Sequence, residues 1–307
     1  MKRLVTIGGG TGQSDLLRYL KAYSFDLSAI VSMVDDGGST GQLRSQLGVL
    51  PGGDVRRCLV ALARQAPALQ SLMEHRFTGG VLVGHPVGNI VLAGLEQSQG
   101  NFARAVALVS QWLDCAGQII PVTIQATTLY AELEDGSVIG GETNIDIPKH
   151  DPQLAIQSVY LGPAVTANPA ALRALRQADM IVLTIGDLYT SVIPNLLVRG
   201  IAQAIRRSSA RLVYTCNRTT KRGETRGFTV AHYLQQIEKY LGGRKIDAVI
   251  VDASIPRDHR TTHVVHYQRS QLERQGVQVV ATPLRGRDRT TIDGKKLARA
   301  IAKLCAE

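Results

Sequence analysis

The chain has 307 residues, 44% of them hydrophobic, and a formal net charge of +10 at pH 7. A chain of this length and composition can bury a full core, either as one large domain or as two coupled halves. Only residues 4–7 separate the Lys2-Arg3 pair from the first glycines, so we expect neither a signal-peptide core nor a membrane span. The expected location is the cytoplasm.

The spacing of the four cysteines also fits the cytoplasm. Cys58, Cys115, Cys216 and Cys305 are far apart and form no C-x-x-C motif. This spacing argues against a zinc site and against a disulfide framework, and it favours reduced, structural thiols.

Positive charge is concentrated in the C-terminal third. Residues 1–195 contain 13 Lys and Arg against 16 Asp and Glu, whereas residues 196–307 contain 22 against 9, a net +13. This excess predicts an anionic partner, such as an acidic protein or a phosphorylated ligand. Nucleic acid is disfavoured, because aromatic residues make up only 5% and do not alternate with the basic ones. Pairs such as Lys295-Lys296 on a predicted terminal helix also fit a merely solvated face.

The first informative motif is the glycine-rich turn at residues 8–12 (GGGTG). It follows a strand-like run at residues 4–7 and precedes a segment with helical spacing at residues 14–20. A strand, a glycine turn and a helix N-terminus together form an anion site, because unpaired N–H groups and the helix dipole point at one spot. Gln13 stands where a dinucleotide-binding motif would have its third glycine, which disfavours an NAD-dependent dehydrogenase.

A second glycine-rich turn, residues 35–41 (DDGGSTG), follows a predicted strand over residues 29–34. In open α/β sheets ligands bind at the carboxyl edge of the strands, where this turn brings Asp35 and Asp36. These carboxylates can hold magnesium on a phosphate, hydrogen-bond a ribose, or cap the backbone of their own loop. The sequence alone leaves these alternatives open.

Strand-like and helix-like segments alternate along most of the remaining chain. Further strands are predicted over residues 122–124, 180–183, 212–215, 248–251 and 277–280. Helices are predicted to begin near Asp54 as a cap and near Pro86, Asn101, Asn168 and Pro194. An Asp135-Gly136 turn between two apolar alternating runs predicts a β-hairpin. The expected fold is α/β and Rossmann-like: a mostly parallel sheet covered by helices, with a hairpin excursion near the middle. We expect one domain over residues 1–307, with a soft boundary near residues 125–165.

Further polar clusters fall where predicted strands end or helices begin. His85 and Asn89 precede an apolar helical run, and residues 186–191 (GDLYTS) directly follow a strand. Asn217 follows the next strand, and the cations of residues 221–222 can clamp a diphosphate or lie in solvent.

Taken together, several motifs in one order resemble the 2-phospho-L-lactate transferase-like family, and within it the bacterial gluconeogenesis-factor branch. The resemblance spans about residues 3–300 and is more specific than any single pattern. The motifs are GGGTG at 8–12, VDDGGSTG at 34–41, GDVR at 53–56, GH and GN between 84 and 89, LYTS and PNLL between 188 and 197, and GET at 223–225. The chain departs from the family pattern at residues 184–187 (TIGD in place of Gly-Pro-Gly-Ser), at Arg57 in place of Asn, and at Arg218, Lys221 and Arg222.

The resemblance implies a Rossmann-like fold with a nucleotide site at the strand edge. For the bacterial branch it implies a UDP-sugar ligand such as UDP-N-acetylglucosamine and a role in cell shape and peptidoglycan synthesis. The expected ligand-binding residues are Gly9, Gly10, Thr11, Gly12, Asp35, Asp36, Gly37, Gly38, Ser39, Thr40, Asp54, Arg56, His85, Asn89, Tyr189, Thr190, Ser191, Asn195 and Asn217.

Two hypotheses follow. In the first, the protein is a non-catalytic sensor, and ligand binding exposes or hides a surface for another molecule. That molecule is a protein partner that contacts the basic C-terminal third, or a second copy of the chain. In the second, it is a magnesium-dependent transferase that moves a phospholactyl-type group from a guanosine diphosphate donor to a deazaflavin hydroxyl. Asp35, Asp36 and Asp54 would then hold Mg²⁺, while Asp36 and His85 would be the catalytic residues.

Overall fold

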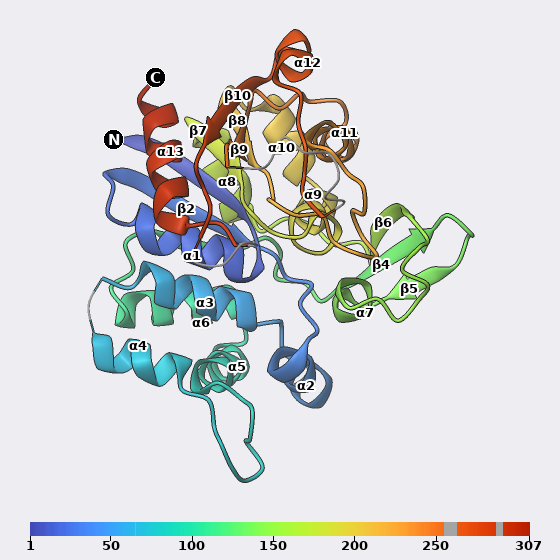
Figure 1. The fold of residues 1–307 in the computed structure, drawn as a ribbon. Helices are drawn as coiled ribbons and strands as arrows, with labels where there is room; N and C mark the ends of the chain where they lie inside the picture. The colour runs from blue at the N-terminus through green and yellow to red at the C-terminus, as the bar shows by residue number, and fades with distance from the viewer. Residues whose placement is uncertain (65, 255–262, 287–290) are drawn as a thin grey trace.

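The computed structural model describes residues 1–64, 66–254, 263–286 and 291–307. A seven-stranded parallel sheet runs through it in the order β10-β9-β8-β7-β1-β2-β3 (Figure 1). Its strands are β1 (Lys2–Gly8), β2 (Phe25–Val31), β3 (Gln118–Pro121), β7 (Met180–Leu183), β8 (Arg211–Thr215), β9 (Ala248–Asp252) and β10 (Gln278–Thr282). The α/β, Rossmann-like prediction is confirmed.

Helices cover both faces of this sheet. In chain order they are α1 (Gly10–Leu20), α2 (Gly38–Leu47), α3 (Gly53–Leu62), α4 (Pro67–Glu74), α5 (Val87–Gln99), α6 (Phe102–Trp112), α7 (Glu142–Asp146), α8 (Pro169–Gln177), the π-helix η1 (Leu188–Val192), α9 (Ile193–Leu197), α10 (Ile201–Arg207), α11 (Val230–Tyr240), α12 (Arg269–Arg274) and α13 (Gly294–Ala306). α1 packs between α3 and α13, while α10 packs against both α8 and α9. No helix of the described residues is long and apolar enough to cross a bilayer.

The chain changes direction in the sheet between β1 and β7. From β1 it moves outward through β2 to β3, and from β7 it moves the other way through β8 and β9 to β10. Because parallel crossovers are right-handed, the connections on the two sides place their helices on opposite faces of the sheet. The carboxyl ends of β1 and β7 therefore form a switch point, where α/β proteins bind ligands.

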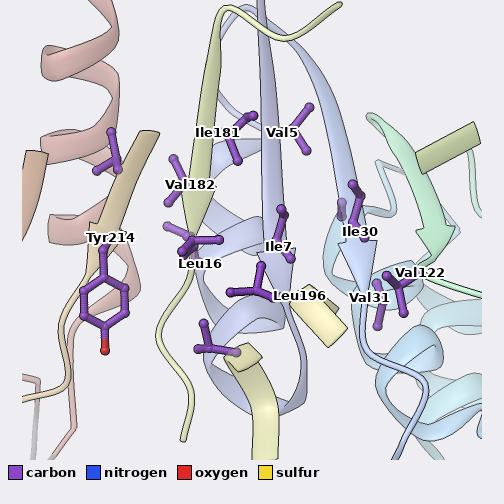
Figure 2. Packing of buried hydrophobic residues seen from close by; sticks show 14 of the residues in the cluster. Val5, Ile7, Leu16, Ile30, Val31, Val122, Ile181, Val182, Leu196 and Tyr214 are labelled. Atoms are coloured by element: carbon purple, nitrogen blue, oxygen red, sulfur yellow. The ribbon is translucent and has the colours of Figure 1, made fainter. Parts of the chain in front are cut away.

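The strands at this switch point are buried on both sides. Leu4 pairs in register with Met180 on β7, and both are almost fully buried. Figure 2 shows the side chains of β1, β2 and β7 in a row, with Leu16 from α1 and Leu196 from α9 among them. Continuous apolar strands of this kind are typical of parallel sheets covered on both faces.

The predicted hairpin is present, and it belongs to a separate antiparallel sheet. β4 (Thr128–Leu133) pairs with β5 (Val138–Gly140) and on its other side with a third strand, β6 (Ile156–Gly162). Figure 1 shows this sheet beside the large one, with α7 next to it. The third strand was not predicted from the sequence.

Two predicted strands are displaced. The run over residues 29–34 leaves the sheet after Val31, although Met33 and Val34 remain buried. The apolar residues at the end of this run are therefore explained by burial and not by strand pairing. The prediction over residues 122–124 is wrong because β3 ends at Pro121. The Val122 N–H still donates to the carbonyl of Val31, the last residue of β2, but the Val122 carbonyl accepts the N–H of Asn168.

Candidate functional site

A cavity of about 1030 Å³ opens at the switch point. It is bounded by the turn after β1, the turn after β7, the loop after β8, α7 and the N-terminus of α13. Six of the predicted binding residues line it: Gly9, Gly10, Thr11, Gly12, Ser191 and Asn217. The volume is at the upper end of the range for small-molecule sites and suits a ligand of nucleotide-sugar size.

The glycine turn after β1 leads directly into α1, as predicted. Gly10 has a φ of +67°, a backbone conformation that glycine adopts without strain. A Cβ on Gly12 would collide with the backbone carbonyl of Ile185, so a side chain there would separate α1 from the turn after β7. Because the first N–H groups of a helix lack intrahelical partners, the N-terminus of α1 offers donors to the cavity.

Gln13 has a structural role that explains why no glycine stands there. Its side chain is fully buried and donates from Nε2 to the Thr6 hydroxyl (3.2 Å) and to the Ile30 carbonyl (3.0 Å). The contact ties α1 to β1 and β2. Close helix-to-turn packing, one role of the third glycine in dinucleotide-binding motifs, is supplied here by Gly12.

Asp54 does not cap α3, contrary to the prediction, because the helix already begins at Gly53 and its N-cap is Gly52. The Asp54 carboxylate instead accepts the N–H of Gly10 at 2.5 Å and pairs with Arg57. An anion of the protein itself therefore already lies at the N-terminus of α1. Arg57, which lines the cavity, offsets that negative charge.

The two carboxylates of the second turn bind backbone. Asp35 accepts the Gly37 N–H at 3.0 Å, which is the loop-capping alternative that the sequence left open. Asp36 accepts the N–H groups of Glu142 (3.1 Å) and Thr143 (2.8 Å) and so holds the first turn of α7 against the large sheet. Neither aspartate is among the cavity-lining residues.

Four other predicted residues come together in one hydrogen-bonded chain beside α2. Arg56 Nε donates to Asn89 Oδ1 (3.1 Å), and Asn89 Nδ2 donates to the Ser39 hydroxyl (3.1 Å). Ser39 Oγ lies 2.9 Å from His85 Nδ1. Ser39 Oγ accepts from Asn89, and whether Ser39 or His85 donates the next hydrogen bond depends on the tautomer of the His85 ring. This chain lies outside the cavity lining.

The remaining predicted residues divide between the cavity wall and the structure behind it. Asn217 donates to the Gly186 carbonyl at 3.0 Å, while its buried Oδ1 has no partner among the described residues. Asn195, fully buried, donates to the carbonyls of Gly8 (3.3 Å) and Ser191 (2.8 Å). Gly37, Gly38, Thr40, Tyr189 and Thr190 do not line the cavity.

An ion cluster at the cavity surrounds the ammonium of Lys221. Its Nζ pairs with Asp146 of α7, with Asp187 at 2.7 Å and with Glu224 at 3.2 Å. Burial, followed by the Asp187 carboxylate, raises the pKa of Glu224 to about 8, while Lys221 opposes that shift. Burial on its own would lower the pKa of Lys221, but the carboxylates around it raise that pKa above its ordinary value.

Glu142, at the start of α7, is a further acid on the cavity wall, and it is half-buried. Burial, and after it the carboxylates of Asp146, Asp35 and Asp36, raises its pKa to about 9. The side chain is therefore protonated at neutral pH and can donate a hydrogen bond into the cavity.

Gly186, Asp187 and Lys221, which belong to the polar clusters noted at the predicted strand ends, also line the cavity. Other lining residues were not predicted from the sequence. They are Asp15, Tyr19, Arg57, Glu142, Asp146, Ile185, Arg218, Thr219, Thr220, Gly286, Thr291, Ile292, Asp293, Gly294 and Lys295. The Asp293-Gly294 pair before the terminal amphipathic run is an N-cap signal, and Asp293 does accept the N–H groups of Lys295 (2.9 Å) and Lys296 (3.1 Å). What the sequence could not give is that α13 crosses back from β10 to lie beside α1.

Comparison with known proteins decides the family. The model of the 2-phospho-L-lactate transferase CofD family matches residues 4–285. The chain belongs to this family. A gluconeogenesis factor of Bacillus subtilis is 36% identical over 287 residues, which cover 91% of this chain and 89% of the relative. One from Halalkalibacterium halodurans is 45% identical over 252 residues, which cover 81% and 77%.

A solved structure supports the same grouping. The crystal structure of a member of the UPF0052 family from Bacillus halodurans matches with a TM-score of 0.91 and 38% identity, covering 98% of each chain. Together with the relatives, it confirms the resemblance drawn from the motifs and the fold drawn from their order.

Proposed function

We propose that this family member is a cytoplasmic regulator of carbon metabolism, cell shape and peptidoglycan synthesis that binds a UDP-sugar such as UDP-N-acetylglucosamine. The observation that carries the proposal is the N-terminus of α1 opening into a cavity of about 1030 Å³ at the switch point. Helix donors there suit a diphosphate, and the remaining volume suits a nucleoside and a sugar. The gluconeogenesis-factor name of the relatives supports the regulatory role.

The arrangement of carboxylates favours binding without a metal ion. Asp35 and Asp36 accept backbone N–H groups, and Asp54 is shared between Gly10 and Arg57. Among the described residues one acidic group has the spacing of a metal site, namely Asp146, Asp187 and Glu224. Lys221 already supplies positive charge to all three of them. These residues fit an ammonium group better than Mg²⁺.

The transferase is the alternative, and the family name is the observation that favours it. In that case Mg²⁺ bound by Asp35, Asp36 and Asp54 would neutralise charge on a guanosine diphosphate donor. The helix donors of α1 would stabilise the diphosphate, and the His85 ring held by Ser39 would position an acceptor hydroxyl. The acids would first have to exchange their backbone partners for the ion.

Calorimetric titration with UDP-N-acetylglucosamine and with GDP, each with and without Mg²⁺, separates the two functions. We expect UDP-sugar binding that does not depend on the metal. Magnesium-dependent binding of GDP, with no UDP-sugar signal, would replace the proposal with the transferase.

A matched pair of variants locates the binding. Asn217→Asp places a negative charge on the cavity wall next to the turn after β7 and should abolish binding of the anionic ligand. Asn101→Asp makes the same chemical change at the N-cap of α6, where aspartate also caps, and should leave binding unchanged. Equal affinities for the two variants would place the ligand elsewhere.

A further inference from the structure

The exposed side of α13 carries a line of basic residues. Lys295, Lys296, Arg299 and Lys303 are all exposed, and residues 294–306 contain no Asp or Glu. Successive residues of an α-helix turn by about 100°, so the four side chains fall within an arc of about 100°. We call these four residues the basic stripe. Its opposite face, with Leu297, Ile301 and Leu304, is buried, and α13 packs against α1.

The basic stripe is electrostatically unfavourable for the helix that carries it. Lys295 and Lys296 lie in the first turn, where the helix dipole disfavours positive charge. Arg299 follows Lys295 by four residues and precedes Lys303 by four, and like charges at that spacing repel. These costs are reduced when negative charge from another molecule covers the stripe.

The residues that the structure describes neutralise little of this charge. Among residues that the structure describes, Lys296 alone of the four lies within 4.0 Å of a carboxylate, Asp293 at 3.8 Å. The Lys296 ammonium also donates to the Arg285 carbonyl at 2.9 Å. Solvated charges of this kind remain available to a partner.

We propose that the basic stripe of α13 is the docking surface for an acidic helical segment of a partner protein, with carboxylates every fourth residue. Such a helix repeats its charges every 6 Å or so, the rise between Lys295 and Arg299 and again between Arg299 and Lys303. The stripe starts at the cavity, because Lys295 lines it. A docked segment would thus lie next to the bound ligand. This inference rests on the proposed regulatory function, which requires a partner.

Two other occupants fit less well. A membrane-surface helix needs an exposed apolar face to insert, and the apolar face of α13 is buried. Binding of single-stranded nucleic acid relies on aromatic stacking, and the stripe carries no aromatic side chain.

The test uses the full chain and a fluorescent alanine-based peptide with glutamate at every fourth position. The double variant Arg299→Glu with Lys303→Glu reverses charge at two stripe residues that do not line the cavity. Its control, Arg206→Glu with Arg207→Glu, makes the same change in net charge at the end of α10. We expect the stripe variant to lose about tenfold or more in peptide affinity and the control to stay within about twofold.

Equal losses in the two variants would overturn the proposal, because only net charge would then matter. So would failure of the unmodified protein to bind the peptide. Displacement of the peptide by duplex DNA, or by vesicles of phosphatidylcholine and phosphatidylserine, would show that the stripe serves another class of partner. Titration of both variants with UDP-N-acetylglucosamine tests the proposed function separately, since a stripe variant that binds ligand normally but not peptide is folded.

Discussion

Glu142 is the residue whose ionisation has the clearest consequence for stability. Its pKa rises from an ordinary 4.5 to about 9, with burial as the main cause. Between these values the unfolded chain has released this proton and the folded chain has kept it. Stability therefore falls as pH rises from about 4.5 to about 9 and is independent of this group below that window.

Glu142→Gln should remove this part of the pH dependence. Melting temperatures measured across that window should fall less steeply for the variant than for the unmodified protein. The control Glu134→Gln changes an exposed glutamate near the small antiparallel sheet and should leave the profile unchanged. If the Glu142 and Glu134 variants had the same profile, the pKa of Glu142 would not be raised in the folded protein.

The Asp54 carboxylate competes with any phosphate for the N-terminus of α1. Asp54→Asn keeps a side-chain oxygen that can accept the Gly10 N–H but removes the negative charge. We expect metal-free affinity for UDP-N-acetylglucosamine to rise severalfold, since a like charge near the diphosphate is gone. Calorimetry of the variant checks this. Asp179→Asn, at the opposite edge of the sheet beside Arg3, should have no effect. If Asp54→Asn instead weakened only the binding that is measured in the presence of Mg²⁺, the result would support the metal role of Asp54.

At the scale of elements, the position of α1 depends on Gly12. Gly12→Ala should destabilise the fold by about 1–3 kcal/mol, because the new methyl group meets the Ile185 backbone and cannot be accommodated by a side-chain shift. Urea unfolding measures the loss. Gly94→Ala provides the comparison, since Gly94 is exposed within α5 and its Cβ would meet nothing within 4 Å. That variant should gain about 0.5–1 kcal/mol from helix propensity. Equal midpoints for the two variants would show that α1 can move away from the turn.

The order of elements was predictable because each leaves a local signal. The N-caps Asn101 and Asn168 were recognised from residue type, and both side chains accept the expected backbone N–H groups. Local sequence signals do not predict where an element ends or pairs when a neighbouring strand determines it. β3 ends early because β2 ends at Val31, and β6 was missed because its pairing with β4 joins residues far apart in the chain.

The candidate site was predictable only in part, for a similar reason. The glycine turn after β1 was found because glycine spacing is a local feature. Glu142 and Lys295 were missed because their place at the cavity depends on how α7 and α13 pack. Asp54 was predicted to cap α3, and its carboxylate instead accepts the N–H of Gly10, a contact that depends on how α1 and α3 pack.

At the scale of the whole molecule, Lys221 joins the small antiparallel sheet to the large one. It reaches Asp146 on α7 next to the small sheet, and Asp187 and Glu224 at the carboxyl edge of the large sheet. Replacing it with methionine keeps the apolar stem but leaves three carboxylates, with ligand atoms within 4.8 Å of one another, without their counter-charge. We expect Lys221→Met to lower stability by about 1–3 kcal/mol. This is less than for a fully buried pair, because the ammonium side chain is 28% exposed.

Magnesium should then restore part of the loss, since oxygen ligands at this spacing suit a divalent cation once the lysine is gone. Melting temperatures with and without Mg²⁺ test this. The control Lys239→Met also connects the two sheets, through a 3.4 Å contact with the Gln157 carbonyl, but it leaves no cluster of acids behind. We expect the ion to raise the melting temperature of Lys221→Met alone. An equal rise in the melting temperature of the unmodified protein would mean that Mg²⁺ binds in the presence of Lys221. That result would favour the magnesium-dependent transferase.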